Sequence, residues 1–303
     1  MQTSKKLRGI IHVNNEKKQH FNKPIMEVIK SRSSVRSYNT DKLSEETKID
    51  LIKYANSIKG PFSPKVRLEF IDNYNILDKS NGKIGTYGII KGAQHFIIAI
   101  VEDGEYNLEQ LGYVLEKFIL YAASLGLGTC WMGGTFKRSD FAKLVELKGG
   151  EIFPIVTPIG YPKDQRSIVE NFMRYAAGSN QRKPWNELFY NESFSNPIEF
   201  KDVEKYADAL EAVRLAPSAS NKQPWKILKS GNVYNFYLKA NKGYADGLGF
   251  NIQKIDMGIA MSHFEMILQE KGINGYWNVE DIQNKNVEAE GMTYCASWME
   301  ATE

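Results

Sequence analysis

Two segments of the sequence resemble each other at a constant spacing. The stretches Tyr106 to Trp131 and Ile252 to Trp277 share a glycine, a phenylalanine, a second glycine and a tryptophan in register. The spacing is 146 residues, the difference between Gly258 and Gly112. Similarity at a fixed spacing constrains the fold strongly, because the chain must then build one unit twice. We therefore expect an internal duplication, with chance agreement as the alternative.

Both repeated segments are predicted to be α-helices. In the first, apolar residues recur every three or four positions, as on one face of a helix. Its other faces carry further apolar residues, and a helix that is apolar all round is usually buried. Asn107 and Gln110 resemble a capping box at its start, and Gly126 is a typical stop. We expect this helix at the centre of its half.

Each half is also predicted to begin with a helix and to contain strands. One helix starts at Ser44, and another breaks before Pro217. Because helices and strands intermix in both halves, the fold class is α/β or α+β. Asn, Ser and Pro cluster from Tyr190 to Pro197, where we expect the linker. The predicted strands are Val66–Ile71, Phe96–Val101, Ile155–Ile159, Lys226–Leu228, Val233–Leu238 and Met292–Ser297.

The composition argues against several classes of protein. The chain has 303 residues, enough for two domains or one large one. Its 39 basic and 36 acidic residues give a net charge of +3, too balanced for a dedicated nucleic-acid binder. No apolar stretch approaches the ~18 residues of a membrane helix, and the N-terminus lacks the apolar core of a signal peptide. Two cysteines, Cys130 and Cys295, fit a reducing compartment. We expect a cytoplasmic protein with an N-terminal extension at residues 1–23.

Several common catalytic motifs are absent from the sequence. No glycine-rich dinucleotide motif follows a strand, there is no P-loop, and the four histidines lack zinc-binding spacing. His95 and His263 are expected to be hydrogen-bonded structural residues. Cys130 has no activating neighbour and is expected to be a small buried residue. We identify no acid–base pair.

One polar cluster follows the first predicted helix. The run from Ser31 to Tyr38 contains two arginines, Arg32 and Arg36, separated by serines and a valine. Guanidinium groups, hydroxyls and exposed backbone amides can converge on one phosphate. The cluster is therefore a candidate phosphate site, and a solvated loop is the alternative.

A second polar cluster ends a helix in the second half. The run from Leu215 to Trp225 brings two prolines, two serines, an asparagine and a glutamine into one loop. Such a loop can present amides, hydroxyls and a carboxamide to the edge of a polar ring. A simple helix-to-strand connection is the alternative.

These two clusters resemble motifs of the FMN-dependent nitroreductase family. The run from Arg32 to Arg36, followed by Tyr38, resembles its opening motif, and Ala216 to Trp225 resembles its second. Gly126 to Gly134, Gly160 to Pro162 and Arg182 to Pro184 are similar to its later motifs. The resemblance covers residues 24–190 and 200–298. It implies an α+β sandwich of sheets and helices, present here in two tandem copies.

The motifs are divided between the two halves. The first half has the arginines but reads Ile58 to Pro64 where the Pro-Ser-x-x-Asn loop belongs, and the second half has only the loop. In the family, each flavin lies between two subunits, with the arginines from one and the loop from the other. The resemblance therefore implies a covalent pseudo-dimer with one FMN site, acting as a monomer.

The resemblance also assigns roles to particular residues. Arg32 and Ser34 would hold the phosphate and ribityl end, and Arg36 would lie by the pyrimidine edge of the flavin. Gly133 and Gly134 match positions whose backbone approaches flavin N5. The full predicted set is Arg32, Ser33, Ser34, Arg36, Gly133, Gly134, Arg182, Pro217, Ser218, Ala219, Ser220 and Asn221.

The reaction implied by the resemblance is a ping-pong oxidoreduction. NAD(P)H would give a hydride to flavin N5, and a nitroaromatic, quinone or similar small acceptor would then take the electrons. The alternatives are a flavin-binding carrier or sensor without significant turnover, and a structural descendant without flavin. No nucleic-acid or membrane partner is expected.

One family feature has no clear match. The family offers Asn and Lys side chains to the flavin from a segment that here reads Gly85 to Gly92. Lys91 or the backbone from Gly85 to Gly88 is a candidate substitute. The segment could also lie over the flavin or be a flexible loop.

Overall fold

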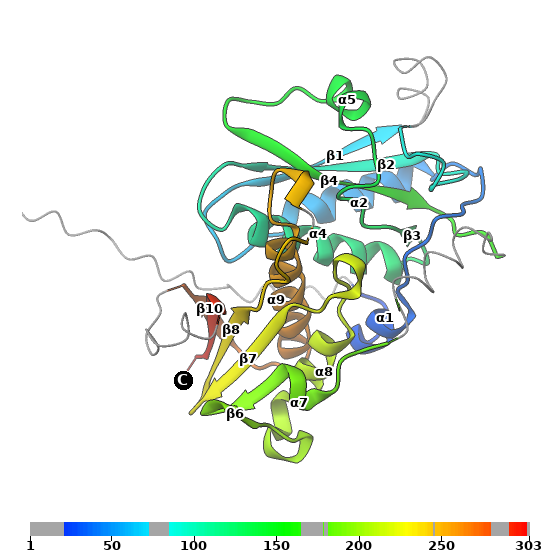
Figure 1. Ribbon diagram of the computed structural model, residues 1–303. Coiled ribbons are helices and arrows are strands. Elements are labelled where there is room, and N and C mark those ends of the chain that lie inside the picture. Colours follow the sequence, from blue (N-terminus) through cyan, green and yellow to red (C-terminus); the bar gives the residue numbers. More distant parts are fainter. Residues whose placement is uncertain are drawn as a thin grey trace, which may run out of the picture.

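The computed structural model describes residues 21–72, 85–164, 178, 181–244, 246–279 and 291–301. Two mixed layers face each other, with one sheet above and one below a pair of crossing helices (Figure 1). The predicted N-terminal extension lies almost entirely outside the described residues. No helix within these ranges is long and apolar enough to cross a bilayer.

The first half forms a four-stranded antiparallel sheet in the order β1-β2-β4-β3. Its strands are β1 (Val66–Asp72), β2 (His95–Glu102), β3 (Gly128–Thr129) and β4 (Glu151–Gly160). Its helices are α1 (Ile25–Ser31), α2 (Glu45–Ser57), α4 (Asn107–Ser124), α5 (Arg138–Phe141) and α7 (Trp185–Leu188).

The second half repeats this arrangement. Its strands β7 (Trp225–Ser230), β8 (Val233–Leu238), β9 (Gly275–Asn278) and β10 (Thr293–Glu300) follow the order β7-β8-β10-β9. This is the strand order of the first sheet, with α9 (Ile252–Glu270) in the place of α4 and α8 (Ala207–Leu215) before the sheet. The predicted duplication and the α+β class are therefore confirmed.

The region predicted as a linker belongs to the second sheet instead. Strands β5 (Phe189–Asn191) and β6 (Ser193–Pro197) form an edge hairpin, and β5 pairs with β7 in parallel. The Asn, Ser and Pro residues that suggested a linker therefore occupy a short edge strand, where such residues are tolerated. The first half ends by extending the sheet of the second.

The two long helices cross at their duplicated glycines. A Cβ placed on Gly112 would lie 2.1 Å from the carbonyl oxygen of Ile255. A Cβ on Gly258 would lie 1.9 Å from the carbonyl oxygen of Glu109. Since Ile255 and Glu109 are also 146 residues apart, the contact is the same from both sides, as at the two-fold axis of a homodimer. This crossing is the pseudo-two-fold centre of the molecule.

The helix ends repeat as well. Gly126 and Gly272 adopt φ of +79° and +73°, and the following residues Leu127 and Ile273 donate to carbonyls five residues back. These are matching αL endings that favour glycine. The predicted capping box at Gln110 is wrong, because its side chain instead accepts a hydrogen bond from the backbone of Phe62 at 2.9 Å.

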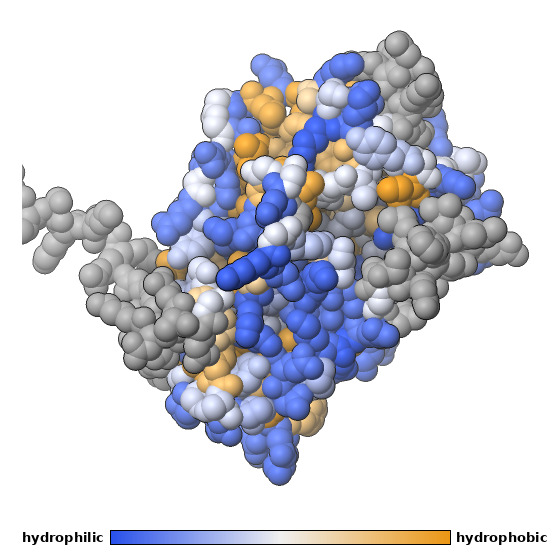
Figure 2. Space-filling view, viewed as in Figure 1, coloured by the Kyte–Doolittle hydropathy of each residue, from blue (hydrophilic) through white to orange (hydrophobic). Residues whose placement is uncertain are grey.

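The main core is shared by both halves. It surrounds α4 and α9 and includes inward-facing residues of both sheets. The first half also contacts the second through α1, whose Ile25 N–H donates to Glu270 at the end of α9 at 2.8 Å. On the face shown in Figure 2, hydrophilic residues cover most of the second half, and hydrophobic residues gather over the first sheet.

Both histidines with predicted structural roles are buried and paired. His263 on α9 contacts the Ala212 carbonyl at 3.0 Å and Glu116 of α4 at 2.9 Å. His95 lies between the Asp72 carboxylate at 2.6 Å and the Leu43 amide at 3.0 Å. These contacts confirm the structural interpretation.

Candidate functional site

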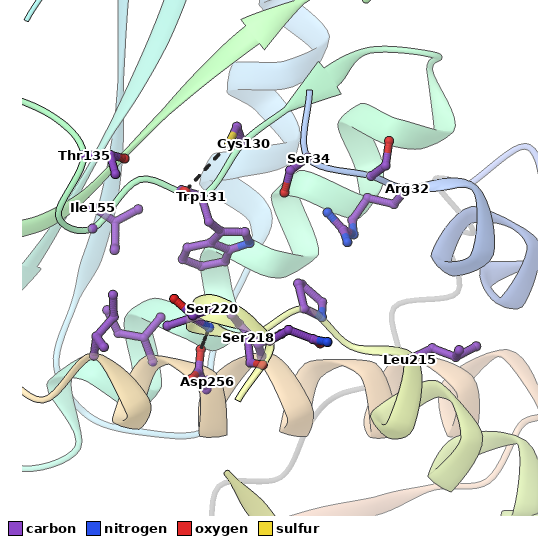
Figure 3. A pocket seen from close by; sticks show the side chains of 18 of the residues that line it. Arg32, Ser34, Cys130, Trp131, Thr135, Ile155, Leu215, Ser218, Ser220 and Asp256 are labelled. Atoms are coloured by element: carbon purple, nitrogen blue, oxygen red, sulfur yellow. Dashed lines mark hydrogen bonds between the residues drawn. The ribbon is translucent and has the colours of Figure 1, made fainter. Parts of the chain in front are cut away.

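A cavity of about 790 Å³ lies between the two halves. Its size is that of a pocket for a small molecule or cofactor. Arg32 and Ser34 lie on one side with Trp131, and Ser218, Ser220 and Asp256 lie on the other (Figure 3). All twelve residues of the predicted site line it. The structure therefore brings together the two clusters that the sequence holds almost two hundred residues apart.

The arginine segment crosses the cavity wall in an extended conformation. After α1 ends at Ser31, the Val35 N–H donates to the Thr129 carbonyl at 2.8 Å. The Lys91 N–H donates to the Arg36 carbonyl, also at 2.8 Å. In an extended chain alternate side chains point the same way, so Arg32, Ser34 and Arg36 share one face. That face lines the cavity.

Arg36 brings an unsatisfied cation to this wall. Its Nε and Nη1 atoms are buried and have no hydrogen-bond partner among the described residues. Buried guanidinium N–H groups without a partner are costly, so such groups are usually matched by an anion or a carbonyl oxygen. The cavity therefore favours a ligand that supplies such an acceptor beside Arg36.

The loop between α8 and β7 is held in a strained conformation. Ser220, Asn221 and Gln223 have φ of +45°, +55° and +47°, a region that residues other than glycine seldom adopt. Internal hydrogen bonds fix the loop: Ser218 Oγ accepts from the Gln223 N–H at 2.9 Å. The Tyr244 hydroxyl donates to Ser220 Oγ at 2.7 Å. Strain of this kind is concentrated at ligand-binding sites.

Asn221 lines the cavity, but its carboxamide forms hydrogen bonds to other residues of the protein. Its Nδ2 donates to the carbonyls of Gly178 and Gln181, both at 2.7 Å. Its Oδ1 accepts from Arg182 Nη1 at 2.9 Å. The contribution of Asn221 is therefore to position Arg182 and the loop, a role that the sequence pattern does not reveal.

The glycine pair lies where the two halves meet. A Cβ on Gly133 would lie 2.5 Å from the side chain of Ile252, and one on Gly134 would lie 3.0 Å from that of Leu248. Arg138 holds this turn by donating to the Gly133 carbonyl at 3.0 Å. The absence of a Cβ at both positions therefore allows close packing against side chains of the second half.

The segment from Gly85 to Gly92 contributes differently from the prediction. Ile89 of this segment lines the cavity, and Lys91 does not. Instead the Lys91 N–H donates to the Arg36 carbonyl, and the Lys91 carbonyl accepts from the Tyr38 N–H, both at 2.8 Å. These backbone hydrogen bonds hold the arginine segment in place.

Several lining residues were missed by the sequence patterns. Trp131 donates its indole N–H to the buried Glu116 at 2.8 Å, which fixes the ring at the cavity wall. Tyr244 lies in a loop without a motif, and Asp256 lies within an apolar helix. An acidic residue among the apolar residues of such a helix is a signal that could have pointed to Asp256, although α9 also carries Glu265 and Glu270. The apolar part of the same wall comes from Ile252, Ile255 and Ile259.

A comparison with protein-family models shows the family of this chain. The family model described as "Putative TM nitroreductase" matches residues 24–288 of this chain, which include the arginine segment, the strained loop and both crossing helices. The chain belongs to this nitroreductase family. The predicted resemblance is thereby confirmed over both halves.

One solved structure agrees with the fold of this nitroreductase-family protein over nearly its whole length. A "putative nitroreductase" from Thermotoga maritima matches with a TM-score of 0.56 at 20% identity, covering 94% of this chain and 98% of that one. A nitroreductase family protein from Clostridium novyi covers 47% of this chain and 87% of its own, at 20% identity and a TM-score of 0.40. A nitroreductase with bound FMN from Bacteroides fragilis covers 48% and 92%, at 16% identity and a TM-score of 0.38. No curated protein matches the sequence.

Proposed function

We propose that this cavity binds one FMN and that the protein is an FMN-dependent NAD(P)H oxidoreductase. The observation that carries the proposal is the meeting of the arginine segment and the strained loop around one cavity. Each cluster alone is compatible with an ordinary loop. Together they offer cations at one wall and a polar turn at the other, which suits a phosphorylated planar ligand.

The residues present fit such a ligand. The guanidinium of Arg32 has no ion pair or hydrogen bond within the described chain, and the unpaired atoms of Arg36 lie at the same wall. FMN carries both a phosphate and ring carbonyls, so it can satisfy both cations. The apolar isoleucines of α9 and the Trp131 ring offer surfaces for a flat aromatic system.

Each part of the cavity then has a role. Arg32, Ser33 and Ser34 would hold the phosphate, with Arg182 nearby. Arg36 would stabilise negative charge that develops on the ring, which favours reduction. Pro217, Ser218, Ala219 and Ser220 would line the ring from the second half, with Asn221 holding Arg182 and the loop in place. When bound, FMN supplies hydride acceptance from NAD(P)H and electron transfer to a nitroaromatic, quinone or similar acceptor.

Anaerobic reduction separates this proposal from its alternative. We expect the purified yellow protein to lose its visible flavin absorption when mixed with NADH or NADPH, and to recover it on addition of a quinone. A flavin-binding carrier or sensor would remain yellow with both donors. Protein that is colourless and takes up no added FMN would contradict the proposal altogether.

Two further features belong to the proposal. We place the two copies at residues 24–190 and 200–298, and expect the chain to act as a monomer because its pseudo-two-fold contact lies within it. We also propose a cytoplasmic location, in keeping with two buried cysteines that form no disulfide, Cys130 and Cys295.

A further inference from the structure

A single carboxyl group lies buried at the floor of the cavity. Asp256 stands on α9 beneath Ser218 and Ser220, across the cavity from Arg32 and Ser34 (Figure 3). It is 2% exposed. No role for an acid was predicted at this position.

Only half of this carboxyl group has a partner. Oδ1 accepts a hydrogen bond from the Ala219 N–H at 2.9 Å, which ties the strained loop to α9. Oδ2 is buried and has no partner among the described residues. A buried polar atom left unpaired costs free energy comparable to a lost hydrogen bond, so this atom needs an explanation.

The duplication supplies an internal comparison. Gln110 stands 146 residues before Asp256, at the matching place on α4. Its Oε1 accepts from the Phe62 N–H, also at 2.9 Å, so it holds the corresponding loop of the first half. Gln110 does not line the cavity. Holding the loop therefore requires only a neutral acceptor. The second carboxyl oxygen distinguishes Asp256, whose loop lines the cavity, from Gln110, whose loop does not.

The surroundings of Asp256 favour its neutral form. Burial raises its pKa well above the usual value, and the hydrogen bond from Ala219 opposes this only in part. Within the described chain no cation forms an ion pair with it. The charged or titratable groups around it are Lys30, Arg32, Arg36, Cys130, Arg182 and Tyr244 at the cavity, Glu109 on α4 and Lys254 on α9.

We propose that Asp256 is a neutral carboxylic acid whose Oδ2–H donates a hydrogen bond to an acceptor atom of the bound FMN. This inference rests on the proposed function. It makes Asp256 a residue that selects the ligand, because a ligand without an acceptor at this point would leave the O–H unpaired.

The protonation state can be tested on the full chain without flavin. An acid whose pKa is raised in the folded state stabilises the fold below its unfolded pKa of ~3.9 and loses that effect as the pH rises toward the folded pKa. We therefore expect the unfolding equilibrium constant of the wild type, divided by that of Asp256→Asn, to rise about tenfold per pH unit above roughly pH 4. Urea unfolding at several pH values measures this ratio. A constant ratio would mean an ionised carboxylate and would overturn the proposal.

The hydrogen bond to the ligand is tested by FMN titration at neutral pH. Asp256→Asn keeps an acceptor for Ala219 and places a permanent N–H donor at the position of Oδ2, so it should bind FMN within about threefold of the wild type. Asp256→Ala should bind about tenfold more weakly. Gln110→Ala removes the matching loop contact away from the cavity and should leave FMN affinity unchanged.

The outcomes separate the two proposals. A wild-type chain that binds no FMN would overturn the proposed function together with this inference. Tight FMN binding by the wild type, with equal affinity in Asp256→Ala, would overturn the inference alone.

Discussion

Replacing Arg36 with alanine is expected to weaken FMN binding about 10- to 100-fold. Hydrogen bonds to a charged group are worth about 1.5–3 kcal/mol, and 1.4 kcal/mol corresponds to a factor of ten. Arg36 is suited to this role because two of its nitrogen atoms are buried without a partner in the described chain. Fluorescence titration of the full chain with FMN measures the change.

A matched control distinguishes this effect from a general loss of charge. Arg67 is held by Glu69 and Glu151 on the first sheet and does not line the cavity. Arg67→Ala should therefore leave FMN affinity unchanged, although it will lower stability. Equal affinity in Arg36→Ala and the wild type would show that this cation does not face the ligand.

Substitutions on either side of the cavity should abolish the binding of FMN. Arg32→Ala removes the free cation from the first half and is expected to prevent FMN from staying bound during purification. The double change Ser218→Ala and Asn221→Ala should do the same from the second half. Its physical basis is the loss of the hydrogen bonds that hold the strained loop and Arg182. If either variant retained full affinity, the two halves would not share one site.

Gly258→Ala is expected to destabilise the fold by about 2–3 kcal/mol. Its new Cβ would meet the Glu109 carbonyl at 1.9 Å and the Tyr113 nitrogen at 2.6 Å, so the two central helices would have to separate. On an open helix the same change would stabilise by about 1 kcal/mol, so the sign of the effect is itself diagnostic. Urea unfolding measures the free energy of unfolding.

Two further variants make this test specific. Gly112→Ala should destabilise the fold by a similar amount, because its new Cβ would lie 2.1 Å from the Ile255 carbonyl oxygen on the opposite helix. Gly247→Ala should be close to neutral, since no atom lies within 4 Å of the added methyl group. Wild-type stability in both helix variants would contradict the close crossing.

The central architecture could be predicted because repeats and local sequence patterns indicate it. The spacing of 146 residues marks Gly112 and Gly258, and glycine at a repeated position indicates a close approach that no other residue permits. The six predicted strands lie within four residues of the observed strands at each end, since β-branched and aromatic runs favour strands. The twelve site residues line one cavity. They could be predicted because several motifs together resemble one family, although each motif alone is compatible with an ordinary loop.

Other features depend on contacts that a sequence pattern does not contain. Strands β5 and β6 form only because the first half reaches the edge of the second sheet, which overrides their weak strand propensity. The carboxamide of Asn221 is directed by residues some 40 positions earlier. Asp256 gains its significance from burial and from an unpaired oxygen, neither of which is visible until α9 is packed.

The molar ratio of FMN to chain tests the central claim most directly. The chain should be purified in the presence of FMN and freed of unbound flavin, and its mass in solution should be determined with its flavin content. A fused pseudo-dimer with one complete cavity predicts one FMN per chain in a monomer. Two FMN per chain, or one FMN shared by two chains, would contradict it.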